Sequence, residues 1–239
     1  MEVVLKVLTW FKGFKHDKKM NLKLPLALFF LALVGSCGTE SEKAANRKQM
    51  QEGMEANKVK RVLPAEIMDG AYKLGDEITN ATQQSLTSHL QEALSGGDLS
   101  AAISYCNLNA LPITDSLAKK YNAAIRRVSL KTRNPKNQPN EMERTLLDAY
   151  VYNQEQGLSL TDNVQKLDEA VFLYNKPIVI KNALCLNCHG KKGETLSDET
   201  LLQLVKLYPN DEATGYHIND FRGMWSVELK KAEIVRGME

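Results

Sequence analysis

The sequence has little charge of one sign and few of the residues that mark fibrous or disordered chains. Its 239 residues contain 31 Lys and Arg against 29 Asp and Glu, which leaves a net charge of +2. So small a charge does not gather phosphates at a surface, and no nucleic-acid partner is expected. Glycine (14) and proline (7) are sparse, no segment repeats at a fixed period, and 43% of the residues are hydrophobic. This composition predicts one compact globular domain preceded by a processed leader.

Cysteine is also scarce, with four residues in the whole chain: Cys37, Cys106, Cys185 and Cys188. Their number and uneven spacing exclude a disulfide framework, which a chain of this length does not need. Each cysteine therefore requires an explanation of its own.

Residues 20–37, MNLKLPLALFFLALVGSC, have the features of a secretory signal peptide. Lys23 gives a basic start, and the apolar run from Leu24 to Val34 is shorter than the ~20 residues that a membrane-spanning helix needs. Its ending resembles a bacterial lipobox, in which Cys37 is acylated and becomes the first mature residue. We therefore expect an extracytoplasmic, periplasm-facing lipoprotein anchored to a membrane, with a buried N-terminal helix as the alternative.

The chain divides into a signal peptide region (1–36), a lipidated polar tether (37–61) and a folded domain (62–239). The tether is polar and lacks a sustained apolar face. Residues 1–19 are either a long basic start or the result of a start codon wrongly assigned upstream of Met20, and both versions leave the expected function unchanged.

Helical and extended patterns alternate along the folded domain. Apolar residues at helical spacing predict a long helix over 65–94 that ends at Gly96-Gly97. Asp98 is a candidate N-cap for a second helix, and Pro112 starts or kinks a further helical stretch to Lys120. The other predicted elements are a strand (123–130), a loop (132–140), a helix (141–156), a hairpin of two strands (168–174 and 176–180), a helix (200–207), a loop (209–223) and a strand (224–232). Helices combined with a small antiparallel sheet indicate an α+β domain.

The segment Cys185-Leu186-Asn187-Cys188-His189 has the C-x-x-C-H spacing of haem c attachment. Two thiols three positions apart can add to the two vinyl groups of one porphyrin, and the next imidazole reaches the iron from the same side. The sequence therefore predicts a single haem c, attached at Cys185 and Cys188, with His189 as an axial iron ligand.

Three other uses of a C-x-x-C pair compete with this interpretation. A thioredoxin-like pair lies at the start of a helix, but Gly190 and the residues to Gly193 follow the motif at once, which argues against such a helix. A zinc site would need a second Cys or His pair. A disulfide across two intervening residues would close too small a loop to stabilise much.

The second axial position of the iron decides between functions, and the candidates are Cys106, His89, His217 and the methionines. Cys106 ends the segment AAISYC, whose small side chains would let a helix lie close to a porphyrin. A thiolate there would favour ferric iron, whereas Met raises the potential. The alternative is that Cys106 packs as a small buried hydrophobe.

Four segments in order resemble one known family: AAISYC, RRVSLKTRNPKNQPNEME from Arg126, ALCLNCHG, and YPNDEATGYHINDFRGMWSVEL from Tyr208. They resemble the PAS-like c-type haem domains long described as a domain of unknown function, which occur alone in exported proteins and as input modules of bacterial sensor kinases. The resemblance extends from Ala65 to Lys231. It implies a PAS-like sheet flanked by helices, a mixed His/Cys ligand pair made by His189 and Cys106, and no established enzymatic reaction.

Two arginines are candidates for contacts with the haem propionates: Arg133, in the segment TRNPKNQPN, and Arg222, before Gly223. Turn chemistry explains the first segment equally well, and a solvated loop charge explains Arg222.

These patterns together predict a haem c protein that acts as an extracytoplasmic redox or small-ligand sensor, with a small electron-transfer cytochrome as the alternative. Its expected partners are the membrane, through the lipid, and a redox protein. Two protein ligands would leave no open iron position, so no enzymatic activity is expected. A peroxidase would need an open distal face with a positioned acid–base group, and a thiol–disulfide oxidoreductase would use Cys185 and Cys188 directly.

Overall fold

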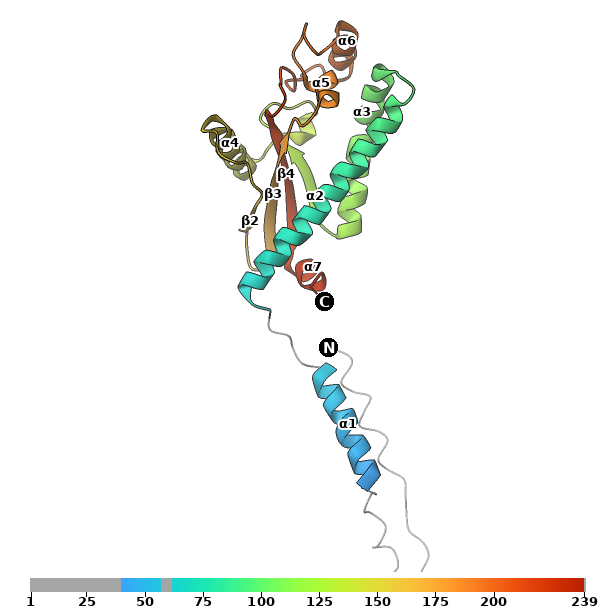
Figure 1. Ribbon diagram of the computed structural model, residues 1–239, viewed down its shortest axis with the longest axis vertical. Coiled ribbons are helices and arrows are strands. Elements are labelled where there is room, and N and C mark those ends of the chain that lie inside the picture. Colours follow the sequence, from blue (N-terminus) through green and yellow to red (C-terminus); the bar gives the residue numbers. More distant parts are fainter. Residues whose placement is uncertain (1–39, 57–61, 239) are drawn as a thin grey trace, which may run out of the picture. The chain divides into compact units, whose positions relative to one another are not determined.

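The computed structural model describes residues 40–56 and 62–238, which belong to two compact units, 1–60 and 61–239 (Figure 1). In the first unit, helix α1 (Glu40–Ala56) is exposed over residues 40–54. The missing apolar face gave no reason to expect a helix in this segment. Its many Glu, Lys, Ala, Gln and Met residues nevertheless have high intrinsic helix propensity. The predicted lipidation site, Cys37, lies outside the described residues.

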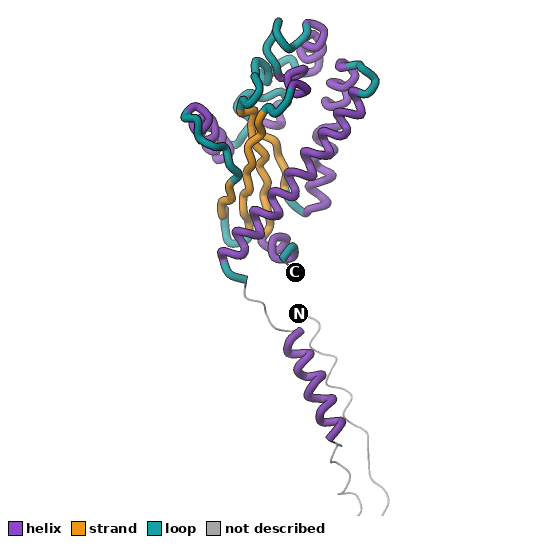
Figure 2. Tube along the Cα trace, viewed as in Figure 1, coloured by secondary structure: helices purple, strands orange, loops and turns teal. Residues whose placement is uncertain are grey.

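The second unit combines helices with one small sheet, as Figure 2 shows. Its helices are α2 (Pro64–Leu94), α3 (Leu99–Tyr121), α4 (Glu141–Glu155), α5 (Ala183–His189), α6 (Asp198–Leu207) and α7 (Lys231–Arg236), with a 3-10 turn η1 (Pro135–Asn137). Its strands are β1 (Ala124–Val128), β2 (Asn163–Lys166), β3 (Val171–Val179) and β4 (Phe221–Lys230). The predicted α+β class is confirmed.

The four strands form an antiparallel sheet in the order β1-β4-β3-β2. Side chains alternate along β4, so that Val227 and Leu229 join the core under α2, whereas Met224 packs with Leu147 of α4. Helices α2 and α3 thus cover one face of the sheet and α4 covers the other. Helices α5 and α6 lie at one end of the sheet, and α7 lies at the opposite end (Figure 1).

The long helix and the N-cap predicted at the start of the domain are both present. The Asp98 side chain accepts a hydrogen bond of 3.0 Å from the backbone N–H of Ala101. Pro112 lies inside α3, which continues through it to Tyr121. Helix α2 approaches β3 closely at Gly75, where a Cβ atom would overlap the ring of Tyr174. Glycine at this position therefore sets the distance between α2 and the sheet.

The predicted hairpin over 168–180 is wrong, because β3 is one continuous strand. A single intervening residue, Asn175, is too short for a tight turn. Instead Asn175 is fully buried, and its Oδ1 accepts a 2.7 Å hydrogen bond from the Tyr150 hydroxyl of α4. Strand β2 pairs with β3 only as far as Asn175, so at Pro177 strand β3 is paired with β4 alone. Proline has no backbone N–H to donate and is tolerated where one side of the strand is an unpaired edge.

The C-terminal prediction needs a second correction. Strand β4 begins at Phe221 and ends at Lys230, and residues 231–236 form α7 rather than the end of a strand. Ile234 of α7 is buried in the core beside α2, so packing favours a helical turn there. Strand β2, which pairs with β3, carried no sequence prediction.

None of the helices within residues 40–56 and 62–238 combines the length and the apolar character needed to cross a membrane.

Candidate functional site

The C-x-x-C-H segment forms helix α5, which follows β3 almost directly. The Asn182 side chain caps its start by accepting a 3.3 Å hydrogen bond from the backbone N–H of Cys185. Gly190 ends the helix and lies so close to Thr195 and to the Leu186 carbonyl that a Cβ atom would overlap both. The expectation that the glycines exclude a helix at this motif is therefore wrong, because Gly190 follows the helix as its C-cap.

The imidazole of His189 is held in one tautomer. Its Nδ1 lies 2.7 Å from the carbonyl oxygen of Ala213. Because a carbonyl only accepts hydrogen bonds, Nδ1 carries the proton and Nε2 keeps a free lone pair. Burial lowers the pKa of His189 well below its usual value, and Arg222 and Arg133 lower it further. The imidazole is therefore neutral, and the lone pair on Nε2 is available to bind a metal ion.

The segment that supplies this carbonyl is fixed to the motif by its backbone. The N–H of Gly215 donates to the carbonyl of Gly190, and the N–H of Tyr216 donates to the carbonyl of His189, both at 2.9 Å. The Tyr216 ring meets the imidazole edge to face, with 6.3 Å between the ring centroids. The loop predicted over 209–223 thus orients the histidine.

The thiols of Cys185 and Cys188 are free and half-buried. Cys188 packs against the cluster formed by Ile103 of α3 with Leu196 and Leu204. Burial raises the pKa of the Cys188 thiol, and Arg133 offsets part of this rise. Cys188 is therefore a neutral thiol in apolar surroundings.

The structure brings Cys106 to the same place. This residue lies half-buried on α3, one turn beyond Ile103, whose side chain packs in the same cluster as Cys188. Burial raises the pKa of Cys106, and Arg127 and Arg133 offset part of the rise. Helix α3 is held against α6 by a 2.8 Å hydrogen bond from Gln203 to Ser104. The sequence places Cys106 and Cys188 far apart, and the fold joins them.

The two other histidine candidates have different surroundings. His89 stacks on Tyr105 between α2 and α3, with 6.4 Å between ring centroids, and its Nδ1 lies 2.7 Å from the Ser85 carbonyl. The His217 side chain is 64% exposed and lies 3.4 Å from Asp220. Both rings therefore already have partners in their own segments.

Arg133 links three parts of the site. Its guanidinium forms an ion pair of 2.9 Å with Asp211, and it donates hydrogen bonds to the carbonyl oxygens of Cys188 (2.6 Å) and Ala213 (3.2 Å). Asp211 in turn accepts a hydrogen bond from the backbone N–H of Ala213. Arg133 thus fixes the same carbonyl that orients His189, a role that its predicted contact with a propionate did not include.

Arg222 occupies a β-bulge. In the pairing of β3 with β4, Ile178 lies opposite Gly223 and Val179 opposite Phe221, so Arg222 is the extra residue. Its guanidinium donates to the Ser129 hydroxyl (2.6 Å) and the Lys131 carbonyl (3.0 Å) and lies 5.3 Å from the centroid of the Tyr216 ring. The bulge directs this side chain toward the segment that holds His189.

Sequence reasoning missed Arg127, whose positive charge lowers the pKa values of both His189 and Cys106. Its signal was the alternation of strand β1, in which Arg126 pairs with Glu143 of α4 and the next residue must face the opposite side.

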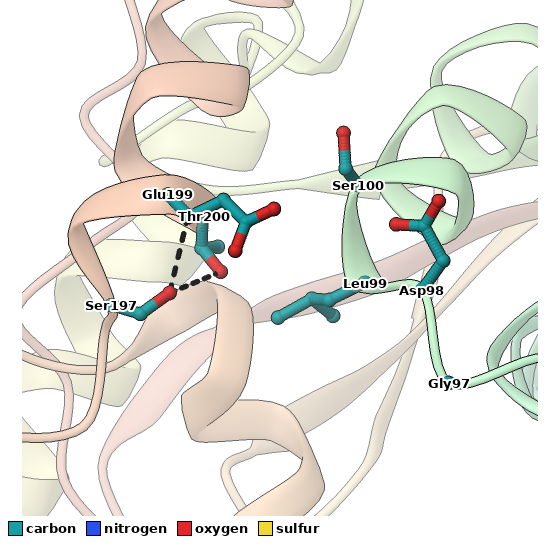
Figure 3. A pocket seen from close by; sticks show the side chains of 7 residues that line it. All are labelled: Gly97, Asp98, Leu99, Ser100, Ser197, Glu199 and Thr200. Carbon is teal, nitrogen blue, oxygen red and sulfur yellow. Dashed lines mark hydrogen bonds between the residues drawn. The ribbon is translucent and has the colours of Figure 1, made fainter.

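A cavity of about 300 Å³ lies between the N-terminal ends of α3 and α6, and Figure 3 shows its side chains. Its lining is made by Gly97, Asp98, Leu99, Ser100, Ser197, Glu199 and Thr200. Carboxylates and hydroxyls dominate this lining, so the cavity is separate from the thiols and imidazole of the motif.

Comparison with known proteins assigns the family. The sequence profile of the Tll0287-like family, described as Tll0287, matches residues 40–229, so the chain belongs to this family. The match begins before Ala65 and includes α1. A solved structure that matches is the "Crystal structure of the cyanobacterial heme-protein Tll0287", with 25% identity over 66% of this chain and 95% of that chain, and a TM-score of 0.46. No functionally curated protein matches the sequence.

The role of Arg133 is testable by a double mutant. Replacing this residue (Arg133→Gln) leaves the carboxylate of Asp211, which is 7% exposed, without its cation, and we expect a loss of about 3 kcal/mol in the free energy of unfolding. The double variant Arg133→Gln/Asp211→Asn should recover part of this loss, as measured by urea denaturation. A double variant that loses the sum of both single effects would show that the two residues act independently.

Proposed function

We propose that this protein binds one haem c through Cys185 and Cys188, with His189 as an axial ligand of the iron. Each thiol would add across one vinyl group, so that sulfur bonds to one vinyl carbon and the thiol hydrogen moves to the other. No oxidant is needed for this addition. The bound group would supply one-electron chemistry at iron.

The observation that carries this proposal is the 2.7 Å contact between Nδ1 of His189 and the Ala213 carbonyl. Histidines that bind metals commonly donate their second ring N–H to a carbonyl, which fixes the tautomer and the orientation of the ring. The two free thiols on the same short helix complete the set of groups that haem c requires. Family membership adds support, because Tll0287, after which the family is named, is described as a heme-protein.

A thiol–disulfide oxidoreductase is the competing use of the two cysteines. Such an enzyme would use Cys185 and Cys188 as a dithiol–disulfide couple, and the histidine that follows them would have no part in the reaction. The Ala213 carbonyl instead orients His189 so that Nε2 is free for a metal, and this arrangement supports attachment chemistry.

We propose Cys106 as the second axial ligand. Ile103, one turn before Cys106 on α3, packs in the same cluster as Cys188, and this proximity supports the assignment, as does the resemblance to domains with a His/Cys pair. With both axial positions occupied, the iron would have no site for a substrate. A redox or small-ligand sensor then suits the site better than an enzyme, and a small electron-transfer cytochrome is the alternative.

The first prediction concerns attachment. After coexpression with a haem c maturation system, the mass of the denatured protein should include the porphyrin. The variant Cys185→Ala/Cys188→Ala should lack this increment, because no thioether can form. Cys106→Ala is the matched control and should keep it. Covalent haem in the double variant would refute the attachment site.

The second prediction concerns the axial ligand. The ferric protein should be low-spin with thiolate character in electron paramagnetic resonance. Cys106→Ala should give high-spin or exogenously ligated iron and a higher reduction potential, because a thiolate favours the ferric state. Identical spectra of the two proteins would leave Cys106 as a packed core residue. His217→Ala would then be the next variant to examine.

The third prediction concerns location. We propose that Cys37 carries the lipid that anchors the protein on the periplasm-facing side of a membrane. The variant Cys37→Ala should move to the soluble fraction and keep its haem, because the anchor precedes the folded unit. Sedimentation of this variant with membranes would contradict a lipid anchor at Cys37.

A further inference from the structure

Arg127 carries a charge that nothing in the described residues neutralises. It lies on β1 opposite Trp225 of β4, and its guanidinium is 5.6 Å from the centroid of that ring. Within residues 40–56 and 62–238, no carboxylate, carbonyl or hydroxyl group forms a hydrogen bond or ion pair with it. Burial lowers the pKa of Arg127, and the charge of Arg222 lowers it further. Arg127 is half-buried, and a guanidinium group in such an environment is normally paired with an anion.

Arg222 is only partly satisfied as well. Its Nη1 has the Ser129 and Lys131 partners, but its Nε is buried and has no hydrogen-bond partner. An unpaired N–H of a charged group in a buried place is costly, so a partner is expected there.

The nearby carboxylate of Asp211 does not neutralise both Arg127 and Arg222. Asp211 interacts with this cluster, but it forms its ion pair with Arg133. Arg133 has further partners in two carbonyl groups. Within residues 40–56 and 62–238, Arg127 and Arg222 therefore form no ion pair with a carboxylate.

We propose that Arg127 and Arg222 form the anion-binding edge of the site and hold the two haem propionates, whereas Arg133 positions the motif. This inference rests on the proposed function. Arg222 lies 5.3 Å from the centroid of the Tyr216 ring, which meets the His189 imidazole edge to face. Arg222 also donates a hydrogen bond to Ser129, two residues beyond Arg127, so both guanidinium groups come from the end of the sheet next to the motif. Two carboxylates would match two guanidinium groups in charge and in hydrogen-bonding geometry.

The test compares two adjacent arginines in the haem-loaded protein. Arg127→Gln removes a cation from the face of β1 that carries the site. The control, Arg126→Gln, removes the same charge from the opposite face, where Arg126 pairs with Glu143 at 3.0 Å. Because Glu143 is buried, the control should also lose stability, so the two variants are compared as folded, haem-loaded proteins. Both proteins should keep covalent haem by mass. The reduction potential should fall more in Arg127→Gln than in the control, because a cation beside the haem favours the less positive ferrous state.

Resonance Raman spectroscopy supplies a second readout. The propionate bending band should shift in Arg127→Gln and stay unchanged in Arg126→Gln, and Arg127→Lys should restore most of the potential. If Arg127→Gln fails to fold, Arg222→Gln should give the same two shifts.

Equal potentials in Arg127→Gln and Arg126→Gln would overturn the inference. The inference would also be overturned if Arg127→Gln changed the g-values of the ferric iron but left the propionate band unchanged, because Arg127 would then act on the axial sulfur. Absence of covalent haem from the wild-type protein would instead refute the proposed function.

Discussion

The hydrogen bond from Nδ1 of His189 to the carbonyl of Ala213 is the constraint on which the rest of the site depends. It leaves Nε2 as the free ring nitrogen and fixes the plane of the imidazole. The same carbonyl accepts a hydrogen bond from Arg133, which also binds Asp211 and the carbonyl of Cys188. One buried carbonyl thus joins the C-x-x-C-H helix to the loop before β4, and the motif is ordered by contacts outside itself.

Much of the fold could be predicted from local patterns. The long amphipathic helix, the Asp98 cap and the α4 pattern all follow from residues close in sequence. The errors arose where distant residues decide. The run over 168–180 forms one strand because Asn175 finds its partner on α4, and residues 231–236 turn into a helix because Ile234 packs beside α2. Propensity cannot reveal either contact.

The site divides in the same way. The C-x-x-C-H spacing made Cys185, Cys188 and His189 candidates without any structure, because haem c attachment requires that spacing. Three features depend on how α3, β1 and the loop meet: the approach of Cys106, the hydrogen bond from Arg133 to the motif, and the charge of Arg127, which has no anionic partner in the part of the chain that the structure describes. Strand alternation could have directed attention to Arg127, since its neighbour Arg126 faces α4.

A crystal structure of the haem-loaded protein would test the central claim most directly. The account predicts iron bound to Nε2 of His189, with Nδ1 still within hydrogen-bonding distance of the Ala213 carbonyl and thioether bonds at Cys185 and Cys188. Iron bound to Nδ1, or a His189 ring turned away from Ala213, would contradict it.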